Sequence, residues 1–102
     1  AYAASKSAVV AMTKVLSKEE ARHGIRVNAV SPGMIAAGMG LGAMERRAPE
    51  SRQQFLNTIP LGREGEASEV AAAVVFLVSD EASYITGQNF NVVGPGEPTP
   101  YI

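Results

Sequence analysis

The sequence contains no cysteine, which excludes disulfide bonds and thiolate metal sites and fits a reducing compartment. It has almost no net charge: nine basic against ten acidic residues give no electrostatic footprint for nucleic acid or an anionic membrane. No apolar run approaches the about 18 residues of a membrane span, and no signal-peptide pattern is visible. The single histidine, His23, is more typical of a helix-dipole interaction than of a metal ligand. With 102 residues, the chain has room for one small domain at most.

The strongest candidates for chemistry are Tyr2 and Lys6, in the stretch Y-A-A-S-K. Their i, i+4 spacing puts both side chains on one face of a helix, one turn apart. At about 4 to 5 Å and an effective dielectric constant near 20, a phenolate and an ammonium attract each other by roughly 3 to 4 kcal/mol. That attraction lowers a phenol pKa by about 2 to 3, from about 10 toward the physiological range. Such a phenol suits general acid–base catalysis, whereas the alternative interpretation is a pair on a solvated helix face.

The first third of the chain predicts one helix–strand unit of an α/β fold with a parallel sheet. Residues 3–22 predict a helix that Gly24 ends. Residues 25–31, which include the β-branched Ile25, Val27 and Val30, predict a short buried strand that Pro32 and Gly33 end. Open α/β sheets bind ligands at the carboxyl ends of their strands, so Pro32 and Gly33 are expected near a ligand. The helix is expected to pack through an apolar stripe with 3.6-residue spacing. The stripe consists of Ala4, Ala8, Ala11, Met12, Val15 and Leu16.

The rest of the chain predicts a loop, two helices and a strand. Residues 34–48, rich in Met and Gly, predict either a mobile lid over an apolar substrate or an ordinary surface loop. A short helix is expected over residues 49–57. Ser68 is expected to cap a helix over residues 69–79, whose apolar surface on more than one side predicts burial against a sheet and a second subunit. The last strand is expected over residues 89–93.

Five stretches in a fixed order carry a resemblance to a known family: Y-A-A-S-K-S-A, G-I-R-V-N-A-V-S-P-G, P-L-G-R-E-G, E-V-A-A-A-V-V-F-L-V-S-D and S-Y-I-T-G-Q. Across nearly the whole chain they resemble the C-terminal part of the short-chain dehydrogenase/reductase family, in its classical branch. The resemblance implies the C-terminal part of a doubly wound, Rossmann-type parallel sheet. Residues 1–102 would then be a fragment of a single dehydrogenase domain, with residues 34–59 as the substrate loop or lid.

The same resemblance implies an oxidoreductase that interconverts a carbonyl and a secondary alcohol with NAD or NADP. It implies that Tyr2 protonates the carbonyl oxygen or deprotonates the alcohol. Lys6 would lower the pKa of Tyr2 and hold the nicotinamide ribose, so that both residues also count as cofactor-binding. Pro32, Gly33 and Ile35 would line the nicotinamide. No metal is expected at this site.

Three departures from the family pattern bear on these expectations. Ala37 stands where the family often has a Thr that holds the carboxamide, and Val93 stands where V-D-G-G is usual. The Gly-rich dinucleotide turn and the catalytic Ser of the family would both precede Tyr2. Two strands and their helices cannot cover a doubly wound sheet, so the isolated 102 residues are expected to fold poorly and to be inactive.

The implied partners are a small-molecule carbonyl or alcohol substrate and further copies of the same protein, in a homotetramer or homodimer. Neither nucleic acid nor a membrane is expected as a partner, and the expected location is the cytoplasm. The alternative is a non-catalytic, truncated or degenerate family member that acts as an association partner. Coenzyme choice and substrate identity stay open, because the residue that selects the ribose 2′ group does not lie in these 102 residues.

Overall fold

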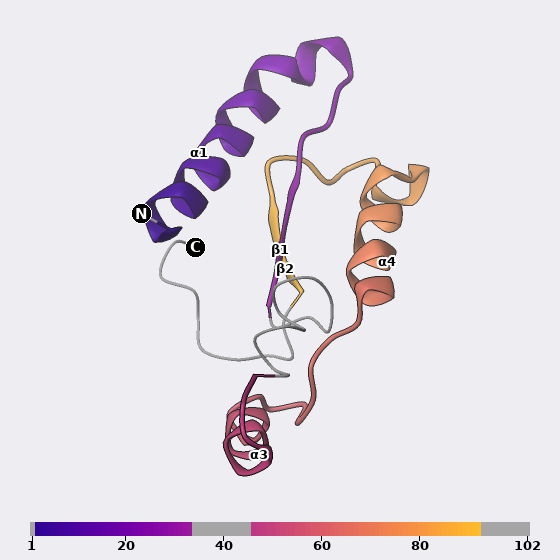
Figure 1. Ribbon diagram of the computed structural model, residues 1–102. Coiled ribbons are helices and arrows are strands. Elements are labelled where there is room, and N and C mark those ends of the chain that lie inside the picture. The colour runs from indigo at the N-terminus through magenta and orange to yellow at the C-terminus, as the bar shows by residue number, and fades with distance from the viewer. Residues whose placement is uncertain (1, 34–45, 93–102) are drawn as a thin grey trace.

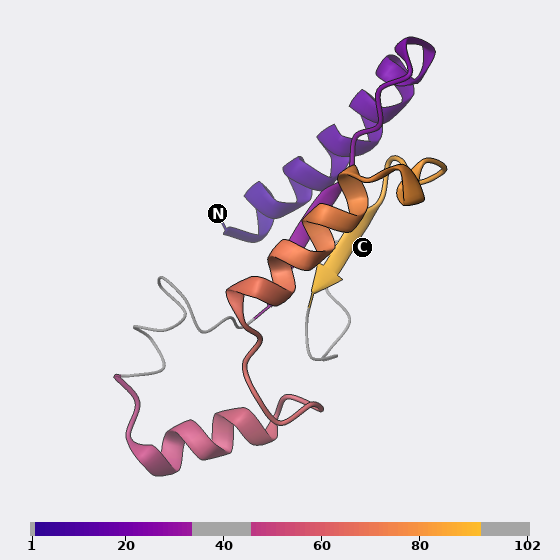
Figure 2. The ribbon, with the colours of Figure 1, turned by 90° about the vertical axis from the view of Figure 1, so that its right-hand side faces the viewer.

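Two parallel strands lie between two helices in a three-layer α/β arrangement (Figure 1). The computed structural model describes residues 2–33 and 46–92. Helix α1 (Tyr2–Glu20) covers one face of the sheet, and α4 (Ala67–Val78) covers the opposite face, as both views show (Figure 2). This arrangement confirms the predicted α/β fold class with a parallel sheet.

The two strands are β1 (Ala29–Pro32) and β2 (Asn89–Val92), paired in parallel with Ala29 opposite Asn89. Helix α1 runs antiparallel to the strands, so its first turn lies at the end of the molecule where the strands end (Figure 1). The short helix α3 (Pro49–Asn57) lies beyond the same end of the sheet (Figure 2). The chain thus gathers several of its predicted functional segments at the carboxyl ends of the strands.

Helix α1 ends as the sequence predicts. After Glu20 the chain tightens into a single 3-10 turn, η1 (Ala21–His23), and Gly24 then adopts a left-handed conformation with φ of 72°. The Gly24 N–H donates to the Ala21 carbonyl at 3.0 Å. Glycine pays no Cβ penalty in this conformation, which explains why the helix stops there.

The predicted packing side of α1 is wrong. Met12 and Val15, members of the apolar stripe, are 57% and 53% exposed, whereas Thr13 and Ser17 are buried. The two hydroxyls are satisfied inside the helix, since Thr13 Oγ1 donates to the Val9 carbonyl at 2.8 Å and Ser17 Oγ donates to the Lys14 carbonyl at 2.7 Å. Small side chains with internal hydrogen bonds can pack closely, so this side faces the sheet and the larger apolar stripe faces outward.

The predicted strand is displaced toward its carboxyl end. The prediction was residues 25–31, but β1 begins only at Ala29 and includes Pro32. The N–H of Ala29 donates to the carbonyl of Gln88, just before β2, and the N–H of Gly33 donates to the carbonyl of Val92 in β2, both at 2.9 Å. Donors toward β2 therefore come from odd-numbered residues, and the missing N–H of Pro32 costs this ladder nothing.

Side-chain hydrogen bonds hold the segment before β1 in place of a ladder. Arg26 donates from Nη1 to the Leu77 carbonyl at 2.7 Å and from Nη2 to the Ser79 carbonyl at 3.2 Å, which satisfies carbonyls at the end of α4. Asn28 donates to the Ile85 carbonyl at 3.0 Å and accepts from the Gln88 N–H at 3.1 Å. These contacts join residues more than fifty positions apart and align the approach to both strands.

Helix α3 confirms the predicted short helix, with Pro49 at its first position. The predicted start of α4 is wrong: the cap residue is Glu66, not Ser68. The Glu69 carboxylate accepts from the Glu66 N–H at 3.0 Å, as in a capping box with a glutamate at the third helical position. Strand β2 confirms the predicted last strand over residues 89–92, and Val93 lies outside the described residues.

Candidate active site

Helix α1 places Lys6 one turn after Tyr2, which is the first residue of the helix. Lys6 is half-buried and lines a cavity of about 220 Å³ between α1 and β1. We call this the Lys6 cavity. Its walls are Ser5, Lys6, Val9, Val10, Val30 and Ser31.

The predicted turn after β1 lies next to this cavity in the chain. Ser31 forms a cavity wall, and Pro32 and Gly33 follow it directly, both exposed. The Gly33 N–H donates to the Val92 carbonyl at 2.9 Å, which fixes the turn to β2. The structure thus brings Lys6 and Ser31, the residue before Pro32, to one cavity. Ile35, Ala37 and residues 34–45 of the predicted lid lie outside the described residues.

A hydrogen-bonded row of polar side chains on the sheet was missed from the sequence. The Ser31 hydroxyl donates to Asn89 Oδ1 at 2.7 Å, and Asn89 Nδ2 donates to Asn91 Oδ1 at 3.4 Å. Ser31 is only 8% exposed. The sequence does contain a pattern that indicates this row: Asn89 and Asn91 occupy alternate positions of β2, which places them on one face of the sheet.

The opposite face of the sheet has a different character. A larger cavity, of about 630 Å³, lies between α4 and the segment that includes β1. Val30, Val74, Leu77 and Val78 contribute apolar walls, and Arg26 and Asn28 also border it. The side chains of Arg26 and Asn28 are engaged in structural hydrogen bonds, so the candidate catalytic residues lie on the α1 face.

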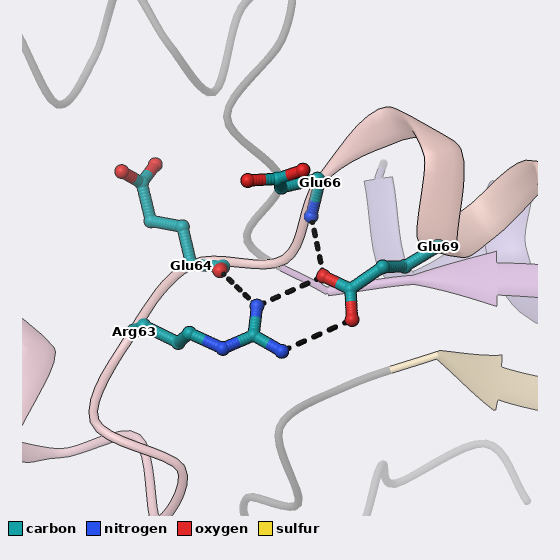
Figure 3. Close-up of polar contacts among 4 residues, drawn as sticks. All are labelled: Arg63, Glu64, Glu66 and Glu69. Carbon is teal, nitrogen blue, oxygen red and sulfur yellow. Dashed lines mark hydrogen bonds and ion pairs between the residues drawn. The ribbon is translucent and has the colours of Figure 1, made fainter.

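An ion pair fixes the segment that leads from α3 into α4. In Figure 3, the guanidinium of Arg63 and the carboxylate of Glu69 point toward each other and make a bidentate contact at 2.8 and 3.0 Å. Hydrogen bonds from Arg63, and then from the Glu66 N–H, lower the pKa of Glu69 to about 2. The pairing also raises the pKa of Arg63. Because both side chains are solvent-exposed, the pair orients this segment more than it stabilises the fold.

Within residues 2–33 and 46–92, no group of three or more His, Cys, Asp or Glu side chains is placed to hold a metal ion. None of the helices described there is long and apolar enough to cross a membrane.

Comparison with known proteins links this arrangement to one group of enzymes. Residues 1–94 match the family described as Enoyl-(Acyl carrier protein) reductase. The chain is 48% identical over 93 residues to the 3-oxoacyl-[acyl-carrier-protein] reductase FabG of Thermotoga maritima, covering 91% of this chain and 36% of that protein. The galactitol 2-dehydrogenase (L-tagatose-forming) of Cereibacter sphaeroides matches with the same identity and the same shares of the two chains.

Solved structures give the same answer for the fold. A 3-oxoacyl-[acyl-carrier protein] reductase from Brucella melitensis superposes with a TM-score of 0.81 at 40% identity, over 99% of this chain and 35% of that one. YwfH, described as an NADPH dependent reductase involved in bacilysin biosynthesis, also gives a TM-score of 0.81, at 36% identity, over 88% of this chain and 37% of that one. The chain therefore spans little more than a third of the length of the relatives that it matches.

Proposed function

Because the chain belongs to the short-chain dehydrogenase/reductase family, we propose that it is part of an NAD(P)-dependent oxidoreductase that interconverts a carbonyl and a secondary alcohol. The observation that carries this proposal is the Lys6 cavity, which joins the predicted catalytic helix to the residue before the Pro32–Gly33 turn. The named reactions of the relatives support it, since reduction of a 3-oxoacyl group and oxidation of galactitol both interconvert a carbonyl and an alcohol.

In this proposal Tyr2 is the general acid in reduction and the general base in oxidation, acting through its phenol oxygen. Lys6 stands one turn later on α1, and its ammonium favours the phenolate form of Tyr2. A phenol whose pKa lies near the working pH can both give and take a proton, which is what a reversible reaction requires.

The residues at this end of the sheet fit the nicotinamide end of NAD or NADP. The Lys6 ammonium offers hydrogen-bond donors to a ribose, and the exposed Gly33 has no side chain to block a close approach. Pro32, Gly33 and Ile35 would line the ring, which supplies or accepts the hydride when the cofactor is bound. At about 220 Å³ the Lys6 cavity is smaller than the roughly 300 to 1,000 Å³ of typical ligand pockets. The rest of a dinucleotide would therefore need other parts of the protein.

We assign the chain to the C-terminal part of a single Rossmann-type domain, with residues 34–59 as a substrate loop or lid. The position of α3, beyond the carboxyl ends of the strands, supports a lid at this end (Figure 2). The exposed apolar side chains of α1, and Val75 and Val78 on α4, at 65% and 73% exposure, support further contacts with the rest of the domain or with other copies in a homodimer or homotetramer. The absence of cysteine fits a cytoplasmic location.

The test of the catalytic proposal is Tyr2→Phe in the intact protein that carries this chain. Removal of the phenolic proton should lower turnover by about 100-fold or more while cofactor still binds. Tyr84→Phe is the matched control, because Tyr84 is fully exposed, and it should keep normal turnover. Near-normal turnover of Tyr2→Phe, measured by nicotinamide absorbance, would refute the assignment of Tyr2.

The isolated 102 residues form a second test. We propose that they fold poorly and are inactive, because large apolar side chains of α1 and α4 are exposed. Thermal unfolding followed by circular dichroism should show no cooperative transition, and titration should show no binding of NAD or NADP. A cooperative melt together with micromolar cofactor binding would contradict this.

A second function, a non-catalytic association partner, is favoured by the same exposed apolar surfaces. The intact mass of the natural protein in its source cells separates the two. A species of more than twice 10.7 kDa supports the oxidoreductase. A species near 10.7 kDa that co-purifies with a full-length relative supports the association partner.

A further inference from the structure

Ser31 belongs to two parts of the site at once. Its side chain forms a wall of the Lys6 cavity, and its hydroxyl donates to Asn89 Oδ1 on β2 at 2.7 Å. It is 8% exposed and directly precedes Pro32. A buried hydroxyl is costly unless it is hydrogen-bonded, so this contact constrains where the end of β1 can lie.

The register of the sheet makes the Ser31–Asn89 bond a diagonal tie. Ser31 lies opposite Asn91, and its hydroxyl reaches back to the preceding residue on the same face of β2, Asn89. Asn89 in turn donates to Asn91 at 3.4 Å. The Ser31–Asn89 bond therefore links the two strands through side chains, in addition to their backbone pairing.

The end of β1 is held by its backbone pairing with β2 and by the side chain of Ser31. Pro32 has no N–H to donate, and the Gly33 N–H donates to the Val92 carbonyl at 2.9 Å. The Ser31 hydroxyl is thus the side-chain tie nearest to the turn, on the face that α1 covers. A shift of Ser31 would move the cavity wall and the Pro32–Gly33 turn together.

We propose that Ser31 and Asn89 are positioning residues that set the distance between Lys6 and the Pro32–Gly33 turn for the nicotinamide end of the cofactor. This inference rests on the proposed oxidoreductase function. The two residues act through the backbone of the turn and do not take part in proton transfer. Their loss should therefore weaken cofactor binding and leave the proton-transfer step intact.

The test uses Ser31→Ala in the intact protein, with cofactor Kd from fluorescence titration and with KM and kcat from steady-state kinetics. We expect Kd and KM for the cofactor to rise three- to ten-fold, kcat at saturating cofactor to stay within two-fold, and the pH profile of kcat to be unchanged. Ser31→Thr keeps the hydroxyl, has a β-branched side chain suited to a strand, and borders a cavity with room for the added methyl group. It should restore most of the affinity.

Asn89→Ala removes the same hydrogen bond from its other side. Because Asn89 is half-buried and Ser31 is buried, we expect this change to disturb folding less than Ser31→Ala does. The double variant Ser31→Ala/Asn89→Ala should bind cofactor no worse than the single variant that binds it more weakly, because each change already removes the shared Ser31–Asn89 hydrogen bond. Ser68→Ala, an exposed serine on α4, is the matched control and should bind cofactor normally.

Three results would overturn the inference: parental cofactor Kd in both single variants, additive losses in the double variant, or no recovery in Ser31→Thr. A fall in thermal stability with unchanged cofactor Kd would also overturn it, since that identifies a structural role alone. The Tyr2→Phe result is independent of these. Normal turnover in Tyr2→Phe refutes the catalytic proposal even where Ser31→Ala weakens cofactor binding.

Discussion

The two faces of the sheet are built differently. On the α4 face, Val30 and the α4 residues Val74 and Leu77 border one cavity, and Leu77 is 6% exposed. On the α1 face, the buried side chains include the hydroxyls of Thr13 and Ser31. Buried hydroxyls therefore distinguish the α1 face, which also buries the apolar Val10, from the α4 face, where Leu77 is buried and Arg26 donates to carbonyls at the end of α4.

This difference matches the roles that we propose for the two faces: the α4 face contributes mainly to stability, and the α1 face holds the candidate active site. Apolar contacts are non-directional and give free energy roughly in proportion to buried area. Hydrogen-bonded contacts give less net free energy but fix geometry more narrowly. Helix α1 carries Tyr2 and Lys6, which we propose as the acid–base pair, so the face that it covers is the one where geometry would matter for the proposed reaction.

The largest expected difference between the faces is in stability. Leu77→Ala in the intact protein should lower the free energy of unfolding by about 2 to 5 kcal/mol, because it removes a buried side chain and leaves a cavity. Thr13→Ala on the α1 face should cost about 1 kcal/mol, since it removes one hydrogen bond within the helix. Urea unfolding of both variants measures the two losses in free energy of unfolding. Equal losses for Leu77→Ala and Thr13→Ala would contradict the difference between the two faces.

Close packing of α1 against the turn before β2 should have a smaller effect on stability than the loss of the Leu77 side chain. Gly87 has φ of 72°, and a Cβ at this position would lie 2.7 Å from Ser17 Oγ. Gly24 has the same φ with open space around it, so Gly24→Ala reports the backbone cost alone, roughly 1 to 2 kcal/mol. Gly87→Ala should cost measurably more in the same unfolding experiment.

The Ser17→Ala change in the Gly87→Ala background serves as the control for this contact. It should recover part of the extra loss by removing the hydroxyl that the new methyl group meets. Identical losses for Gly87→Ala and Gly24→Ala would show that α1 does not pack tightly on this turn.

The smallest expected effect lies outside both faces, at Arg63 and Glu69. Pairing lowers the pKa of Glu69 from an ordinary value near 4.5 to about 2, so its contribution to stability is present above pH 4.5 and is lost as the pH falls toward 2. Glu69→Gln should remove this part of the pH dependence, and the exposed Glu81→Gln should not. Because the pair is solvent-exposed, high salt should shrink the difference. Urea midpoints from pH 2 to 6 that are the same for Glu69→Gln and the parent would contradict it.

Sequence patterns located most elements but not their packing. Helix periodicity, the Gly24 stop and the β-branched strands are local signals, and the structure confirms them within a few residues. The packing side of α1 was wrong because hydropathy counts the hydroxyls of Thr13 and Ser17 as polar, although both are satisfied within the helix.

The site was only partly visible in the sequence for a related reason. The i, i+4 spacing was enough to single out Tyr2 and Lys6, since both lie on one helix. Ser31 and Asn89 are 58 positions apart and meet only through the parallel pairing of the strands, which no local pattern reveals. Strand register is a tertiary property, so this part of the site required the structure.

The measurement that tests the account most directly is the pH dependence of alcohol oxidation by the intact protein with Lys6→Met, at saturating cofactor. If Lys6 lowers the pKa of the Tyr2 phenol, its loss should raise the apparent pKa of the rate profile by about 2 or more, so that activity returns only toward pH 10. Lys18→Met, a change at an exposed lysine in the last turn of α1, should keep the parental profile. The same profile for Lys6→Met and the parent protein would contradict the assignment of Tyr2 and Lys6 as the acid–base pair.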